Sequence, residues 1–231
     1  MAAMTTFRDA VGSWAAGGSA GPAGEAAASL GLRTAVLLEG PSDLAAVEAL
    51  AALRGRDLAA EGVCVLSMDG AMNAGRFARV LGPPGLSLRL TGLCDERERP
   101  YYDRGLERAG APRDGVFVCV ADLEEELIRA LGAQRVEETV RAEGDLRAWR
   151  TFRSRPAQRG RSRERQLRRF LGTRKGRKIR YGRVLAEALR PGEVPAPLEG
   201  LFSHLWPRPA PRPRPARPGH FRPAPRLRPP P

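Results

Sequence analysis

A short apolar run that ends in a carboxylate, TAVLLEGPSD at residues 34–43, constrains the fold of this chain more than any other segment. Its aliphatic residues predict a buried strand over 34–39, and the polar residues after it predict the start of a helix. Glu39 is therefore expected at the carboxyl end of a strand, and Asp43 in the first turn of the next helix. Ligands bind at this edge of open α/β sheets, where Gly40 would let a phosphate approach closely.

Both acids also have a purely structural interpretation. An acidic residue in the first turn of a helix complements the helix dipole, so Asp43 alone does not identify a site. Glu39 carries more weight, because a carboxylate at the end of an apolar strand is costly to bury without a partner. The residues alone leave a functional and a structural role for Glu39 about equally balanced.

Strands and helices alternate along the rest of this half of the chain. Apolar runs predict three further strands, at 63–68, 86–94 and 116–120. Helical periodicity predicts the segments between and after the strands, at 43–54, 72–81, 101–109 and 123–131. Helical connectors between apolar strands imply parallel pairing through right-handed crossovers. The expected fold class is α/β, with a four-stranded, mainly parallel, doubly wound sheet.

Charge is divided unevenly along the chain, whose formal net charge is +13. Residues 1–147 hold 16 Arg against 22 Asp and Glu, whereas residues 148–231 hold 23 Lys and Arg against 4 acids. Such a basic half is expected to attract nucleic acid. Composition predicts four parts: an Ala/Gly-rich helical or flexible segment (1–32), a metal-binding domain (33–132), a basic helical extension (133–206) and a disordered Pro/Arg-rich tail (207–231).

Several classes of protein and of site are excluded. The chain has no apolar stretch near 18 residues and no signal-peptide pattern, so a cytoplasmic protein without membrane contact is expected. Its 3 cysteines lie inside predicted strands without a CxxC spacing, which argues against a zinc site and a disulfide framework.

Acidic residues recur where the predicted strands end. Asp95 closes the third strand, and Asp122 and Glu124 follow the fourth. Parallel strands place their carboxyl ends on one edge, so these acids can gather with Glu39 and Asp43. Carboxylate oxygens in this number suit Mg²⁺ or Mn²⁺, and a pair of such ions can clamp a phosphodiester. Singly, each acid would be a helix cap.

The EGPSD motif, the segment SMDGAMNAGRF, the strand end at Asp95 and the later ADLE together resemble a TOPRIM domain. The type is that of the OLD (overcoming lysogenization defect) family of nucleases, and the resemblance covers roughly residues 33–190. It implies a TOPRIM-like sheet with two bound ions. Glu39 and Asp43 would hold one ion, and Asp95 and Glu124 the other.

The same resemblance implies roles for residues outside the acidic cluster. Lys178 would stabilise the transition state beside the catalytic Glu39, with Lys175 as the second candidate. Apart from the resemblance, Gly40 and Gly70 suit a close approach of phosphate to the metal edge, and a simple turn-and-cap role is the alternative for Gly70. The basic stretch would track the nucleic-acid backbone, through Arg174, Lys175, Arg177 and Arg180.

Two features depart from the family pattern. Asp95 is followed by Glu96 and Arg97 rather than by the usual Asp-x-Asp, so the two expectations are a weaker metal position or replacement of the second aspartate by Glu96 or Glu98. OLD nucleases also carry an ATPase domain, but the chain contains no GxxxxGK[ST] motif. The chain is therefore expected to be either a stand-alone nuclease-like module or one half of a split system with a separate ATPase subunit. A homodimer is a further candidate assembly.

The leading functional hypothesis is a divalent-metal-dependent nuclease acting on DNA, with RNA as the other candidate substrate. One alternative is a catalytically weak TOPRIM module that binds nucleic acid through its basic half, which the missing second aspartate favours. The other is nucleotidyl transfer, because the same kind of metal site serves that chemistry.

Overall fold

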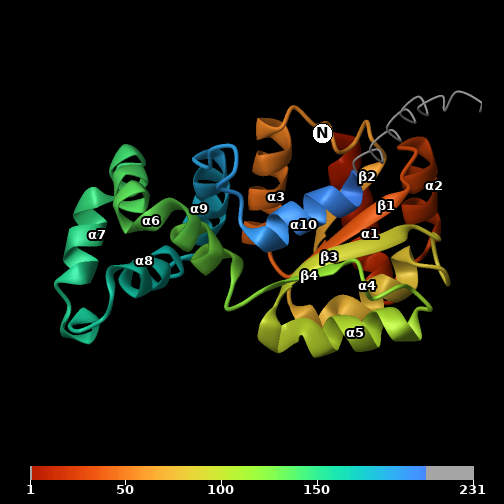
Figure 1. Cartoon of the computed structure of the whole chain (residues 1–231). Helices are drawn as coiled ribbons and strands as arrows, with labels where there is room; N and C mark the ends of the chain where they lie inside the picture. Colours follow the sequence, from red (N-terminus) through yellow and green to blue (C-terminus); the bar gives the residue numbers. More distant parts are fainter. Residues whose placement is uncertain (1, 207–231) are drawn as a thin grey trace, which may run out of the picture.

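A sheet of four parallel strands forms the centre of the α/β part of the molecule, in the order β2-β1-β3-β4 (Figure 1). The computed structural model describes residues 2–206, and the tail predicted at 207–231 lies outside the described residues. The strands are β1 (Thr34–Leu38), β2 (Val63–Ser67), β3 (Arg89–Asp95) and β4 (Val116–Cys119). The predicted α/β class and parallel doubly wound sheet are confirmed.

Helices cover both faces of this sheet because the strands bury side chains on both sides. In β1, Ala35 and Leu37 belong to one apolar cluster, and Val36 and Leu38 to the other. The first face carries α1 (Ala2–Ala15), α2 (Gly21–Ser29), α4 (Ala74–Leu81) and α5 (Arg99–Arg108). The second carries α3 (Pro41–Leu53), the first half of α6 (Leu123–Ala142), α9 (Lys175–Glu187) and α10 (Ala196–Leu205).

The N-terminal segment, expected to be helical or flexible, is helical and packed. Phe7 and Val11 of α1 are fully buried against the first face of the sheet.

Three short 3₁₀ turns also occur among the described residues: η1 (Ala71–Asn73), η2 (Glu96–Glu98) and η3 (Pro156–Gln158). None of the helices between residues 2 and 206 combines the length and apolar character needed to cross a bilayer.

A helical arm, residues 133–174, extends beside the α/β part (Figure 1). It begins where α6 kinks at Gly132, whose φ of 75° is left-handed, and contains α7 (Leu146–Arg153) and α8 (Arg163–Leu171). Its core is aromatic: the rings of Trp149, Phe152 and Phe170 lie 5.2 to 6.2 Å apart between centroids. The arm is therefore a folded unit, although it lies in the strongly basic part of the chain.

One carboxylate ties the arm to α9. Asp145 precedes α7 and accepts hydrogen bonds from Arg177, from Arg180 and, at 3.1 Å, from the hydroxyl of Tyr181. Burial opposes ionisation of this carboxyl, but its hydrogen bonds, first from Arg177, hold the pKa of Asp145 below its usual value. This cluster fixes the arm relative to the helix that carries Lys178.

Helix α9 packs against α3 so closely that only glycine fits at their contact. A Cβ atom built on Gly182 would lie 2.4 Å from the carbonyl oxygen of Ser42, at the start of α3. We expect Gly182→Ala to lower the free energy of unfolding by roughly 1–3 kcal/mol, because the backbones must separate. Urea denaturation measures the change.

The matched control is Gly176→Ala on the same helix, where an added Cβ meets nothing within 4 Å. This variant is expected to be neutral or more stable by up to about 1 kcal/mol, since alanine restricts the unfolded chain. Equal stability of the two variants would contradict the close approach of α9 to α3.

Candidate metal centre

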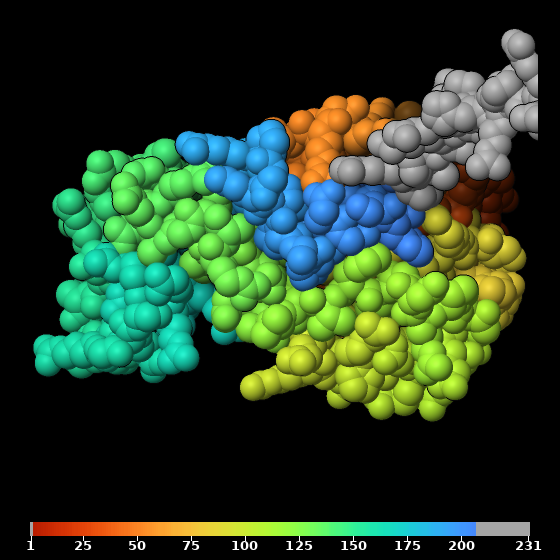
Figure 2. Space-filling view, in the orientation of Figure 1, coloured from red at the N-terminus to blue at the C-terminus, as the bar shows by residue number. Residues whose placement is uncertain are grey.

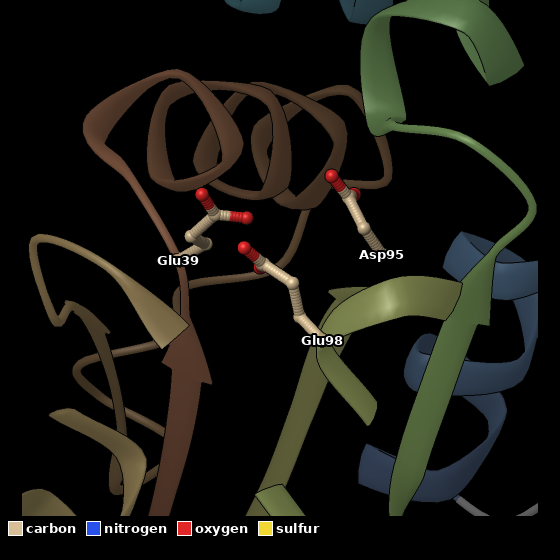
Figure 3. Close-up of side chains that lie close together, drawn as sticks. All are labelled: Glu39, Asp95 and Glu98. Atoms are coloured by element: carbon tan, nitrogen blue, oxygen red, sulfur yellow. The ribbon is translucent and has the colours of Figure 1, made fainter. Parts of the chain in front are cut away.

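The carboxyl ends of β1 and β3 bring three carboxylates together. Glu39, Asp95 and Glu98 each offer one oxygen, and these oxygens lie within 4.8 Å of one another. Figure 3 shows the three side chains pointing toward a common space. Glu39 directly follows β1 and Asp95 ends β3, while the η2 turn carries Glu98 back to the same edge. Of the two predicted replacements for the second aspartate, Glu98 joins the cluster, and Glu96 is exposed.

Hydrogen bonds from two backbone N–H groups hold the segment that follows β1. The N–H of Gly70 donates to the carbonyl of Glu39 at 2.9 Å, and the N–H of Gly40 donates to the carboxylate of Asp43 at 3.0 Å. Neither N–H is thus free to bind a phosphate. What Gly70 offers is space, because a Cβ built there would meet nothing within 4 Å.

A second acidic group lies beside the first. Glu124, in the first turn of α6, is only 4% exposed, and its Oε1 lies 3.3 Å from the Nζ of Lys178 on α9. Burial opposes the charge of this lysine, yet the carboxylates of Glu124 and Asp43 hold the pKa of Lys178 above its usual value. The structure therefore brings Lys178 to the acidic edge, although α9 lies far from Glu39 in sequence.

Burial and neighbouring carboxyl groups raise the pKa values of four of these acids, Asp43, Asp95, Glu98 and Glu124. Burial, and then the charge of Glu124, raises the pKa of Asp43 to about 7. Burial, and then the charge of Glu39, raises the pKa of Asp95 to about 7. A hydrogen bond with Glu39, together with burial, raises the pKa of Glu98 to about 8. Carboxylates held this close repel one another as anions, and a bound cation removes that repulsion.

Two unpaired oxygen atoms fit the donor requirement of a divalent ion. Oε2 of Glu98 and Oε2 of Glu124 are buried and have no hydrogen-bond partner among the described residues. Buried polar atoms are rarely left without a partner, so each marks a place where a further group would bind. Carboxylate oxygens are the ligands that Mg²⁺ and Mn²⁺ prefer. The residues at this edge therefore fit a divalent cation.

Asp122, also predicted as a metal ligand, is engaged elsewhere. One of its oxygens caps α6 by accepting from the N–H of Glu125 at 2.8 Å. The other accepts from the guanidinium of Arg168 on α8, at 2.6 and 2.7 Å. Sequence reasoning missed Arg168 because 46 positions separate it from its partner, and nothing distinguishes it from the other arginines of that stretch.

The described chain is similar to solved structures of OLD proteins. It resembles the C-terminal region of the Xanthomonas campestris pv. campestris OLD protein at 24% identity and a TM-score of 0.54, covering 75% of this chain and 94% of that one. It resembles the C-terminal region of the Burkholderia pseudomallei OLD protein at 20% identity and a TM-score of 0.54, covering 75% and 96%.

Sequence comparison adds a family assignment for the segment that contains the first acids. A search of curated proteins gives no match to the chain. Residues 32–95 match the model of the family described as overcoming lysogenization defect protein-like, TOPRIM domain. Residues 32–95 are therefore similar to OLD-like TOPRIM domains, in a chain with the fold of the C-terminal regions of OLD proteins.

Proposed function

We propose that this protein is a divalent-metal-dependent nuclease that hydrolyses phosphodiester bonds in DNA. The observation that carries the proposal is the convergence of Glu39, Asp95 and Glu98 at the carboxyl edge of the sheet. TOPRIM domains generally bind divalent metals, and OLD-like TOPRIM domains belong to a nuclease-type family. The basic second half of the chain supports a polyanionic substrate.

Two groups of residues would hold the ions. Glu39, Asp95 and Glu98 would bind one ion, and Asp43 with Glu124 would bind the second. When bound, such ions polarise a phosphoryl oxygen and lower the pKa of a water molecule. This grouping differs from the division expected from sequence, in which Asp95 was paired with the acid of α6.

Lys178 would act on the substrate directly. Its side chain is 44% exposed while its Nζ stays beside Glu124, so the ammonium group can contact a phosphate at the edge of the site. A fixed cation there opposes the negative charge that develops on the phosphorus-bound oxygens in the transition state. Lys175 is exposed, three residues earlier on α9, and would contact the backbone of the nucleic acid.

Cleavage of supercoiled plasmid DNA tests the proposal. We expect nicking with Mn²⁺ or Mg²⁺ and none with EDTA, and we expect Asp95→Asn to reduce the rate by at least about 100-fold because it removes one anionic ligand. Salt-sensitive binding without cleavage in either metal would instead support the catalytically weak binding module. Incorporation of labelled nucleotide would support nucleotidyl transfer.

A separate ATPase subunit, a homodimer and a cytoplasmic location stay predictions. Size measurement in solution, alone and with a candidate ATPase, would test the two assemblies.

A further inference from the structure

The helical arm and the start of α9 carry arginines that are free to bind anions. Among the described residues, ten exposed arginines of the arm and the start of α9 have no carboxylate within the 4.0 Å ion-pair distance, and six of them line two hollows. These six, named here the free arginines, are Arg147, Arg155, Arg161, Arg165, Arg169 and Arg174. They are distinct from the arginines that hold the arm together.

The free arginines line two adjoining hollows. The first is lined by Arg161, Arg165 and Arg169 and reaches Glu124 and Lys178 at the metal centre. The second is lined by the remaining three, Arg147, Arg155 and Arg174. Phe152 and Thr173 border both hollows, so the basic surface continues from one to the other. In Figure 2 a notch separates the arm, in teal, from the yellow-green part of the α/β domain, whose residues line neither hollow.

Ion pairs within the protein distinguish other arginines of this region from the free arginines. Arg177 and Arg180 are bonded to Asp145, and Arg168 is bonded to Asp122. Using these three for phosphate binding would require ion pairs inside the protein to break. The free arginines carry no such cost. Of the predicted arginines, Arg174 and Arg177 both line the second hollow, but Arg177 is bonded to Asp145 and Arg174 has no carboxylate partner among the described residues.

The surface offers charge but no stacking platform. Proteins that bind single strands without sequence preference stack bases on exposed aromatic rings. The rings of the arm are instead buried, with Trp149 and Phe170 each 1% exposed and Phe152 7% exposed. Contacts made here are therefore with phosphates, which a duplex presents along its outside while its bases stay stacked.

We propose that the free arginines form a track that binds the phosphate backbone of duplex DNA and leads it to the metal centre. The statement that the track leads DNA to the metal centre rests on the proposed nuclease function. The binding of DNA by the free arginines does not depend on catalysis. It assigns substrate binding to α8 and to the α7 side of the arm rather than to the buried face of α9.

Binding of a fluorescent duplex in EDTA, measured by anisotropy at several salt concentrations, tests the track without cleavage. One variant carries Arg161→Gln, Arg165→Gln and Arg169→Gln, and a second carries the same change at the other three free arginines. Each neutralised phosphate contributes about 0.9 to the slope of log affinity against log salt. We expect each variant to lose about 2–3 from that slope and at least about 10-fold in affinity.

The matched control removes the same charge from the opposite edge of the sheet, through Arg79→Gln, Arg89→Gln and Arg108→Gln. These three are exposed and lie at the end of α4, the start of β3 and the end of α5. We expect the control to bind within about 2-fold of wild type. Circular dichroism verifies that all variants are folded.

Two results would overturn the track: arm variants that bind like the control, or wild-type protein that prefers a single strand over the duplex of equal length. A different result would contradict the nuclease proposal while supporting the track. In that case the arm variants lose binding as expected, while wild-type protein with Mn²⁺ or Mg²⁺ leaves the bound DNA intact.

Discussion

Replacing Glu39 by Gln is expected to lower metal-dependent cleavage of plasmid DNA roughly 1,000-fold, about 4 kcal/mol of transition-state stabilisation. Glu39 faces both Asp95 and Glu98, so it contributes anionic charge at the centre of the cluster. Gln keeps the size of the side chain, and the backbone there is fixed by the N–H of Gly70. The loss is therefore expected in the chemistry rather than in the fold. Initial nicking rates at saturating Mn²⁺ measure it.

Two further measurements separate loss of the ion from general damage. Calorimetric titration with Mn²⁺ is expected to show one fewer site in Glu39→Gln. Without metal, this variant is expected to melt at a higher temperature than wild type, because it removes one of the repelling carboxylates. The matched control is Glu96→Gln, an exposed neighbour of the cluster, which should cleave at the wild-type rate. Unchanged cleavage by Glu39→Gln would remove the basis of the metal site.

The sequence predicted the sheet well because each strand and helix carries its own periodicity. The parallel order followed from helical connectors between apolar runs, and parallel order alone places Glu39 and Asp95 on one edge of the sheet. The observed ends of a strand differ from the predicted ends where a residue adopts an unusual backbone conformation. The strand predicted from 86 begins at Arg89, because Ser87 adopts a left-handed φ of 55° in the preceding loop.

The sequence alone could not predict which charged side chains pair with one another in the folded protein. Whether Glu96 or Glu98 would join the cluster depended on how η2 turns after β3, which no local pattern states. Charge pattern could not distinguish committed arginines from free ones either. Arg177 and Arg174 stand three residues apart on the same basic stretch, yet only Arg177 meets Asp145, because the arm folds back onto α9. Local periodicity thus predicts elements, while tertiary contacts decide which charges remain available.

Replacing Lys178 by Met is expected to lower the rate of cleavage by roughly 100- to 1,000-fold, the usual loss when one fixed group that stabilises transition-state charge is removed. Met keeps the aliphatic part of the side chain but leaves Glu124 without its ion-pair partner. An unpaired buried carboxylate is destabilising, so the metal-free variant should also melt at a lower temperature. Mn²⁺ is expected to restore most of that stability without restoring the rate. Single-turnover cleavage and thermal melting with and without Mn²⁺ measure the two effects.

The matched variant is Lys175→Met, one turn earlier on α9 and exposed. A lysine that only tracks phosphates contributes to affinity and to the salt dependence of binding, whereas a lysine that acts on the transition state contributes to the rate at saturating DNA. We therefore expect Lys175→Met to weaken binding and to keep the single-turnover rate, and Lys178→Met to do the reverse. If the single-turnover rate instead fell in Lys175→Met and held in Lys178→Met, the two roles would have to be exchanged. The salt bridge to Glu124 would then be purely structural.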